Sequence, residues 1–275
     1  MDKQILKRLL IAEWSFRRLV TSIIFIYAVV CLYVFLTADA KIFLPQPSSY
    51  QDTQDIIKIT TPDQIQLSAV YRQNQAAIYT ILYAHGNAED LGDIEPVLQK
   101  LQSLKFNVFA YDYRGYGTSQ GKPTEQNAYR DIETAYNYLT QQLAVPSQRI
   151  IAYGRSVGSG SAVDLAYSKQ LAGLVLESAF TSAFRVIVPF PIFPFEKFPN
   201  IDKIKKVDCP VLVMHGKADD TIPFAHGQQL FAAVKSPKLS LWVDEAGHND
   251  LMWVAGQRYA ETLGKFAQLI KQTQS

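Results

Sequence analysis

The chain has 275 residues, of which 48% are hydrophobic and 12% aromatic, and its formal net charge is +2. This composition excludes a disordered chain, which lacks the apolar surface needed to offset its ordering entropy, and the scattered Lys and Arg residues argue against a nucleic-acid-binding surface. The two cysteines, Cys31 and Cys209, exclude a disulfide framework and a cysteine-rich metal site.

Residues 19–38 contain no charged side chain. They are long enough to cross a membrane as one helix, because about 20 apolar residues span a ~30 Å hydrocarbon core. Since positive residues stay on the cytoplasmic side, we expect residues 1–18 in the cytoplasm, residues 19–38 in the bilayer and the rest across the membrane, in the periplasm if the organism is bacterial. The basic residues before the span are Lys3, Lys7, Arg8, Arg17 and Arg18, and only Lys41 follows closely.

Two other interpretations of this apolar stretch stay open. Ala38, Asp39 and Ala40 form an A-x-A pattern typical of signal-peptide cleavage, although the apolar run is longer than the ~7–15 residues usual for a signal peptide. A buried helix of a soluble protein is the other alternative, although no polar stripe interrupts the run. We favour an uncleaved anchor, followed by a short tether at residues 39–55.

Residues 56–275 alternate β-rich apolar runs with helical patterns, and we expect them to form one domain. The first two runs flank a turn at Thr61-Pro62-Asp63-Gln64 and predict a hairpin. The later runs are apolar throughout, which is typical of parallel strands buried on both faces, so we predict a doubly wound, mostly parallel α/β sheet. The predicted strands are 56–60, 67–71, 79–84, 107–111, 149–153, 173–177, 210–215 and 238–243. The predicted helices are 94–104, 125–142, 157–168, 226–234 and 251–272.

The segment Gly154-Arg155-Ser156-Val157-Gly158 lies between a predicted strand and a predicted helix and matches G-x-S-x-G. In this motif a tight turn holds the serine in a strained backbone conformation with its hydroxyl outward, and the glycines let neighbouring chain pass closely. The start of the following helix adds partial positive charge beside a developing anion. A turn that only packs a helix on the sheet is the alternative interpretation, but the residues that follow favour a nucleophile at Ser156.

A serine nucleophile needs a histidine that takes its proton and a carboxylate that orients the histidine. The loops after the last two predicted strands supply Asp219 and His248, which gives the chain order Ser, Asp, His. Asp220 is the next candidate for the acid, and Glu177 is a weaker one. The other histidines have structural explanations: His215 ends a predicted strand, His226 starts a predicted helix, and His85 lies in a turn.

Acyl transfer also needs backbone N–H donors for the oxyanion. We expect one from Val157, the residue after the nucleophile, and one from Asn87 in the loop after an early strand, with Ala88 as the alternative. An ordinary turn is the other interpretation of this loop. Asp112 ends a strand but precedes Ser156 in the chain, and we interpret it as a hydrogen-bonding brace for the adjacent turn.

Motifs for cofactors and metals are incomplete. Gly115-Tyr116-Gly117 would need a third glycine where Gln120 stands to bind a dinucleotide, and no phosphate-binding loop occurs. The four histidines do not have the spacing of a metal site. We therefore expect neither an organic cofactor nor a metal.

Six segments carry a resemblance to known proteins: IFLPQPSSYQDT (42–53), HGNAEDLGD (85–93), YDYRGYGTSQGKPTE (111–125), YGRSVGSG (153–160), HGKADDTIPFAHG (215–227) and EAGHND (245–250). Together they resemble the α/β-hydrolase fold, and within it the membrane-anchored serine hydrolases of the Bem46 and α/β-hydrolase domain-containing protein 13 group and the related protein 17 group. The resemblance implies a triad of Ser156, Asp219 and His248 that hydrolyses an ester or thioester without a cofactor. Proteins of the 17 group remove palmitoyl groups from proteins and carry an N-terminal cysteine cluster, in whose place this chain has an apolar span.

Between Glu177 and Val207 the strand–helix alternation breaks, and we expect a small cap inserted at residues 178–207. Its dense prolines prevent a long helix, and its aromatic side chains would be costly to expose unless they cover an apolar partner. We interpret the cap as a surface for an acyl chain or the bilayer; a loop that only packs on the domain is the alternative. The cap residues assigned to the substrate are Phe184, Phe190, Phe193 and Phe195.

The sequence therefore predicts a membrane-anchored serine hydrolase that cleaves an ester or thioester, with lipid-like acyl substrates favoured. A serine peptidase acting on small peptides is one alternative. A non-catalytic protein that binds a lipid or a partner on the same fold is another. No feature of the sequence predicts the oligomeric state.

Overall fold

The computed structural model describes residues 16–274. The chain divides into two compact units, one that ends at Lys41 and one that starts at Ile42. Helix α2, Phe16–Ile42, contains the predicted span and is the one helix of the described residues that is long and apolar enough to cross a membrane, by length and composition alone. Positions 1–15 of the predicted basic segment, residues 1–18, lie outside the described residues.

The unit that starts at Ile42 is built on one eight-stranded sheet with the strand order β1-β2-β4-β3-β5-β6-β7-β8. β1 and β2 form the predicted hairpin, β2 also runs antiparallel to β4, and every later pair is parallel. This confirms the predicted, mostly parallel sheet. The strands are β1 Ile57–Thr60, β2 Gln66–Arg72, β3 Thr80–Ala84, β4 Asn107–Tyr111, β5 Ile150–Arg155, β6 Gly173–Glu177, β7 Val211–Gly216 and β8 Lys238–Val243.

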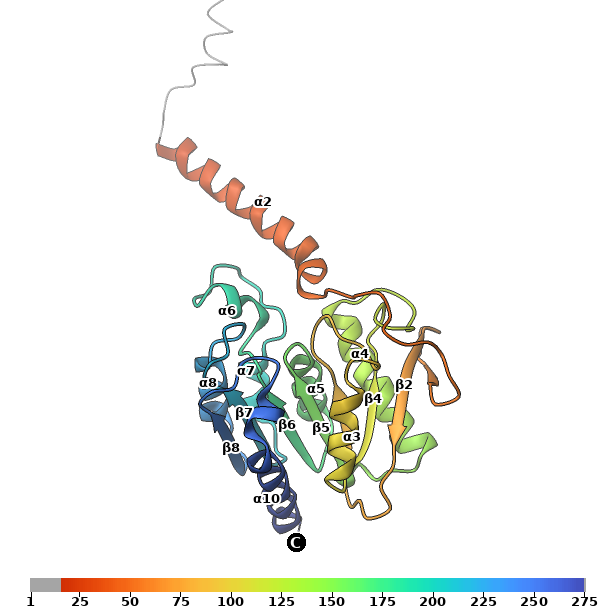
Figure 1. Ribbon diagram of the computed structural model, residues 1–275. Coiled ribbons are helices and arrows are strands. Elements are labelled where there is room, and N and C mark those ends of the chain that lie inside the picture. The colour runs from red at the N-terminus through yellow and green to blue at the C-terminus, as the bar shows by residue number, and fades with distance from the viewer. Residues whose placement is uncertain (1–15, 275) are drawn as a thin grey trace, which may run out of the picture. The chain divides into compact units, whose positions relative to one another are not determined.

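Helices cover both faces of this sheet (Figure 1). On β3, Leu82 packs into the hydrophobic cluster that contains α4 and α5, whereas Ile81 and Tyr83 pack into the cluster that contains α3 and α10. Because successive strand residues point to opposite faces, burial of both faces requires an unbroken apolar run. The helices of the domain are α3 Glu95–Ser103, α4 Glu125–Asn137, α5 Gly158–Ser168, α6 Ala183–Ile187, α7 Asn200–Lys203, α8 Ala225–Ala233, α9 Leu251–Ala255 and α10 Gln257–Thr273.

Two predicted helices differ from the structure. The single helix expected over 251–272 is wrong, because the chain breaks at Gly256, where φ is +51°, and forms α9 and α10 instead. Glycine adopts such a φ at little cost, so it can separate two helices. The helix expected over 125–142 ends as α4 at Asn137 and continues as a π-helical turn, Tyr138–Gln142.

The carboxyl ends of the parallel strands meet at one edge of the sheet. The loops after β3, β5, β7 and β8 at this edge carry the predicted oxyanion, nucleophile, acid and base residues. The cap follows β6 and contains only two short helices, α6 and α7, as its proline content predicts. Figure 1 shows α6 at the same edge of the sheet.

Candidate active site

Ser156 occupies a sharp turn between β5 and α5. Its φ is +52°, in the left-handed region that is strained for a residue with a side chain, and its N–H donates a hydrogen bond to the Glu177 carbonyl at 2.9 Å. A Cβ at Gly154 would collide with the backbone of α5, and a Cβ at Gly158 would collide with the carbonyl of Ala84. The two glycines therefore allow the tight strand-to-helix turn that the sequence motif predicts.

The structure brings the three predicted triad side chains together, although they lie far apart in the chain. His248 Nε2 is 2.9 Å from Ser156 Oγ, and His248 Nδ1 is 2.9 Å from Asp219 Oδ2. Both distances lie in the hydrogen-bonding range. The imidazole thus connects the hydroxyl on the turn after β5 with the carboxylate on the loop after β7.

Asp219 is held by its own loop as well as by the histidine. Its Oδ1 accepts hydrogen bonds from the N–H groups of Thr221 at 3.0 Å and Ile222 at 2.8 Å, and its Oδ2 lies 3.3 Å from Nε2 of the buried His215. Burial opposes ionisation, but the hydrogen bonds from His215 and His248 outweigh it and hold the pKa of Asp219 well below its ordinary value. The carboxylate is therefore charged at neutral pH.

The other two acid candidates lie elsewhere. Asp220 is exposed, and its carboxylate accepts a hydrogen bond from the Thr221 hydroxyl. Glu177 is buried beneath the turn, where it accepts hydrogen bonds from the hydroxyls of Tyr153 and Tyr259, and burial raises its pKa. Among the described residues, Asp219 is the only one whose carboxylate hydrogen-bonds to the candidate base, His248.

The loop after β3 presents a backbone N–H in the place that the sequence predicts. The N–H of Gly86 donates to Glu89 Oε1 at 2.5 Å, and the N–H of Ala88 donates to Asn87 Oδ1 at 3.0 Å. Among the residues that the structure describes, the N–H groups of Asn87 and Val157 have no hydrogen-bond partner. They are therefore available to an oxyanion, whereas the alternative donor at Ala88 is already engaged.

Asp112 braces the same loop from below. It is fully buried, and it accepts hydrogen bonds from the Leu91 N–H at 3.0 Å and from the Tyr50 hydroxyl at 2.5 Å. Its Oδ1 also lies 3.3 Å from Nε2 of the buried His85. Burial would lower the pKa of His85, but the hydrogen bond and charge of Asp112 raise it overall. This arrangement fits the bracing role that the sequence predicts for Asp112.

Arg155 is an organising residue that the sequence analysis missed. Its guanidinium donates to Glu89 at 2.6 and 2.5 Å and to Asn249 Oδ1 at 2.6 Å, and its Nε lies 3.7 Å from Glu177. One buried side chain thus joins the loop after β3, the turn at Ser156 and the loop after β8. The motif G-x-S-x-G leaves this position unspecified, so the sequence carried no signal for it.

The predicted cap residues form a partly buried aromatic cluster with one exception. The rings of Phe184, Phe193 and Phe195 lie 5.6 to 5.9 Å apart, a distance typical of packed aromatic pairs. Phe190 does not belong to this cluster and is 60% exposed. Arg185 holds the cap together through Glu196 and the Phe190 carbonyl.

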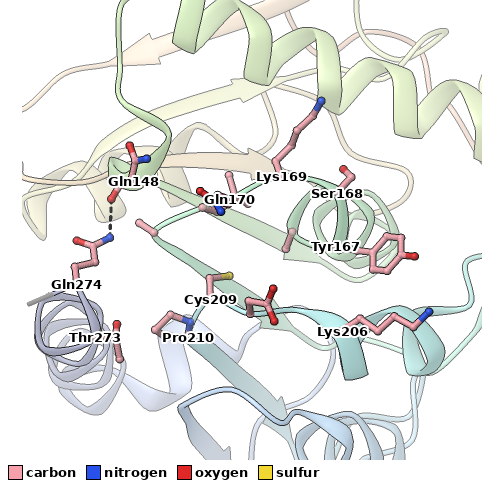
Figure 2. Close-up of a pocket in the computed structure, with 14 residues that line it drawn as sticks. Gln148, Tyr167, Ser168, Lys169, Gln170, Lys206, Cys209, Pro210, Thr273 and Gln274 are labelled. Carbon is pink, nitrogen blue, oxygen red and sulfur yellow. Dashed lines mark hydrogen bonds between the residues drawn. The ribbon is translucent and has the colours of Figure 1, made fainter.

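A separate pocket lies at the opposite edge of the sheet. It is lined by the segments that precede β5, β6 and β7, around Gln148, Lys169 and Pro210, and by the end of α10, where Gln274 donates to the Gln148 carbonyl (Figure 2). The triad side chains follow the other ends of these strands, so this pocket is not part of the candidate active site. No cluster of potential metal ligands occurs among the described residues.

Comparisons with known proteins bear on this geometry. Residues 75–194 match a family model described as serine aminopeptidase, S33. The human protein "alpha/beta hydrolase domain-containing protein 17B" is 43% identical over 199 residues, which cover 71% of this chain and 67% of the human protein. The chain belongs to the α/β-hydrolase family. A second α/β-hydrolase domain-containing protein, aho-3 of Caenorhabditis elegans, is 44% identical over 68% of this chain and 57% of its own length.

Solved structures agree with the α/β-hydrolase fold. The Pyrococcus furiosus esterase Pf2001 aligns with a TM-score of 0.68 over 82% of this α/β hydrolase and 98% of the esterase, at 21% identity. An α/β hydrolase from Vibrio vulnificus aligns with a TM-score of 0.63 over 77% and 80% of the two chains, also at 21% identity. At such identities the likeness shows the fold. Membership of the α/β-hydrolase family supports a hydrolase.

Proposed function

We propose that this α/β hydrolase is a serine hydrolase that cleaves an ester or thioester through an acyl-enzyme. The observation that carries the proposal is the imidazole of His248, which lies 2.9 Å from Ser156 Oγ on one side and 2.9 Å from Asp219 Oδ2 on the other. In the neutral histidine, Nδ1–H donates to the carboxylate and leaves Nε2 as the acceptor for the serine proton.

The proposed reaction proceeds in two acyl transfers. Ser156 Oγ attacks the substrate carbonyl while His248 Nε2 takes its proton, and the N–H groups of Asn87 and Val157 stabilise the oxyanion. The tetrahedral intermediate collapses, the C–O or C–S bond breaks, and His248 returns the proton to the leaving alcohol or thiol. Water then attacks the acyl-enzyme by the same route, which releases the carboxylic acid and restores Ser156.

We further propose a lipid-like acyl substrate. The aromatic cluster of the cap supplies apolar surface beside the carboxyl edge of the sheet, and Ile187 and Phe190 on the cap are 85% and 60% exposed. The apolar helix α2, proposed to be a membrane anchor, would keep the domain close to lipids. Both features favour acyl chains over polar substrates, because exposed apolar surface is costly unless it meets an apolar partner.

An activity-based fluorophosphonate tests the proposal, since it phosphonylates an activated serine. We expect labelling of the full chain that disappears in Ser156→Ala and in His248→Ala. Ser161→Ala is the matched control, because Ser161 is also buried at the same helix but donates to the Ala128 carbonyl. Labelling that persists in Ser156→Ala would contradict Ser156 as the nucleophile, and a folded parent chain that takes up no label would favour a non-catalytic binding protein on this fold.

A peptidase is the second candidate, favoured by the family model over residues 75–194. An aminopeptidase needs a carboxylate that binds the substrate's amino terminus. Two carboxylates near the turn, Glu89 and Glu177, already face Arg155, which favours ester substrates. Hydrolysis of aminoacyl p-nitroanilides at rates above those of p-nitrophenyl esters would decide for the peptidase.

A further inference from the structure

The residues directly after α2 are docked on the hydrolase domain, although the sequence suggested a tether. We call residues 42–50 the strap. Phe43 is buried, with its ring edge-on to the rings of Tyr113, Tyr116 and Phe198 at centroid distances of 6.3, 6.5 and 5.9 Å. An apolar side chain buried at this point fixes the strap to the loops at the carboxyl edge of the sheet.

The strap holds the side chain of Asn87, whose backbone N–H is the candidate oxyanion donor. Asn87 Nδ2 donates to the Ile42 carbonyl at 2.6 Å, and the Leu44 N–H donates to Asn87 Oδ1 at 2.9 Å. The Tyr116 hydroxyl donates to the same Oδ1 at 2.6 Å and accepts from the Leu44 N–H at 2.9 Å. Both ends of the amide are thus fixed by the strap or by a side chain bonded to it.

The strap contacts the same loop a second time. The Ser49 N–H donates to Asp90 Oδ2 at 2.7 Å, and its hydroxyl bonds to Asp90 Oδ1. The Tyr50 hydroxyl donates to Asp112, the carboxylate that also accepts the Leu91 N–H. The loop after β3 therefore rests on the strap along its length rather than at one point.

We propose that the strap is a positioning element for the oxyanion donor, so that catalysis depends on the residues that directly follow the apolar helix. An oxyanion donor is effective only when its N–H lies 2.7–3.1 Å from the oxygen that becomes charged. Ala88, next to the donor, has a φ of +57°, a conformation that neighbouring contacts must maintain. The inference rests on the proposed function, because it assigns a role to the donor of that reaction.

The test uses the full chain and a pair of substitutions at one exposed position. Leu44→Pro removes the N–H that bonds to Asn87 and Tyr116, whereas Leu44→Ala keeps it, and the Leu44 side chain is itself 50% exposed. We expect Leu44→Pro to lower kcat for a short p-nitrophenyl ester by about tenfold or more with little change in KM, because a displaced donor loses transition-state binding. Leu44→Ala should match the parent.

Inhibition by a boronic acid distinguishes a strap that positions the oxyanion donor from a strap that only stabilises the fold. The tetrahedral boronic acid adduct on Ser156 places an oxygen where the oxyanion forms. The inhibition constant of the boronic acid should therefore rise in Leu44→Pro by the same factor by which kcat falls. If Leu44→Pro does not fold, Tyr116→Phe decides, because it keeps the ring and removes the hydroxyl that links the strap to Asn87. Its control is Tyr129→Phe, because the Tyr129 ring packs on Phe198 and its hydroxyl bonds to Glu125, away from Asn87.

The experiments distinguish a failure of the strap inference from a failure of the proposed function. If Ser156→Ala abolishes turnover but the folded strap variant keeps the kcat and boronic acid affinity of its control, the strap has no positioning role and the inference is overturned. If Ser156→Ala is as active as the parent, the proposed function itself fails. A loss of kcat matched by a loss of boronic acid affinity, with Ser156 still required, supports the inference.

Discussion

At the residue scale, Arg155 connects the loop after β3 and the loop after β8 through Glu89 and Asn249, and it also faces Glu177 at the end of β6. A lysine would keep the charge but could not bridge two acceptors with one planar group. We expect Arg155→Lys to lower kcat by about tenfold, because small displacements of reacting groups are costly, and to lower the melting temperature. Steady-state kinetics and thermal unfolding of the same sample measure both effects.

A second buried arginine provides the control for this substitution. Arg114 is 3% exposed and forms ion pairs with Asp63 and Asp131, but it has no contact with the triad. Arg114→Lys should therefore lower stability with little change in kcat. If both arginine variants lose kcat only in proportion to their unfolded fraction, Arg155 has a structural role alone.

The two neighbouring aspartates differ in what they contact. Asp219 bonds to His248 at 2.9 Å, whereas Asp220 is exposed. Asp219→Asn should lower kcat by about 10⁴-fold, because the amide favours the wrong histidine tautomer, while Asp220→Asn should stay near the parent. Ester hydrolysis by the two variants checks this. A fully active Asp219→Asn variant beside an inactive Asp220→Asn variant would show that the acid is misassigned.

Asp219 also predicts how stability depends on pH. Burial opposes ionisation of this carboxyl, but hydrogen bonds from His215 and His248 hold its folded-state pKa below the ordinary value of about 3.9. A carboxylate with a lowered pKa stabilises the fold above its unfolded-state pKa, and this contribution is lost as the pH falls through the folded-state pKa. The difference in unfolding free energy between the parent and Asp219→Asn should thus shrink below about pH 4. Denaturant unfolding of both proteins at pH values around 4 measures this difference. An increase in the difference on acidification would contradict a lowered pKa of Asp219.

At the element scale, the sheet could be predicted because each buried parallel strand leaves a local signal. The run Ile81–Ala84 must be apolar at every position, since alternate residues enter clusters on opposite faces. The turn at Ser156 was predictable for a similar reason, because its neighbouring glycines satisfy a local steric demand. The order of elements along the chain then placed Asp219 and His248 at the same edge of the sheet.

Other features depend on contacts between distant residues and were not visible in the sequence. The strap looks like a flexible linker because Pro and Ser are common in it, yet Phe43 is buried by rings that lie far along the chain. Arg155 stands at an unspecified position of its motif. Gly256 allows either a continuous or a broken helix, and the tertiary structure selects the break.

The cap is the element that should set chain-length preference. Its aromatic cluster, Phe184, Phe193 and Phe195, offers apolar surface to an acyl chain. We expect kcat/KM to rise from p-nitrophenyl acetate toward longer esters, and Phe193→Ala to flatten that rise by about 1–3 kcal/mol of binding energy while sparing the acetate. The control is Ile78→Ala, because Ile78 is 63% exposed but lies just before β3, at the edge of the sheet opposite the cap. Equal rates for all acyl lengths in the parent would remove the support for a lipid-like substrate.

At the scale of the whole molecule, α2 and the hydrolase domain are separated by almost no free chain. α2 ends at Ile42, and Phe43 is already buried in the domain. An extended chain spans at most about 3.6 Å per residue, so an anchor at residues 19–38 would keep the start of the strap within about five residues of the bilayer. Anchoring and catalysis would then be coupled through the strap.

We expect the charges on the two sides of the proposed anchor to set its orientation. Arg17 and Arg18 directly precede the apolar stretch, whereas Lys41 follows it, so the domain should lie across the membrane from the cytoplasm. Alkaline phosphatase fused after Ser275 in a bacterial host should be active, because it folds only outside the cytoplasm, and green fluorescent protein at the same position should stay dark. Replacing Arg17 and Arg18 with Gln should reduce the phosphatase signal, since it weakens the charge difference that sets orientation. A fluorescent fusion with an inactive phosphatase would reverse the topology and place the candidate active site in the cytoplasm.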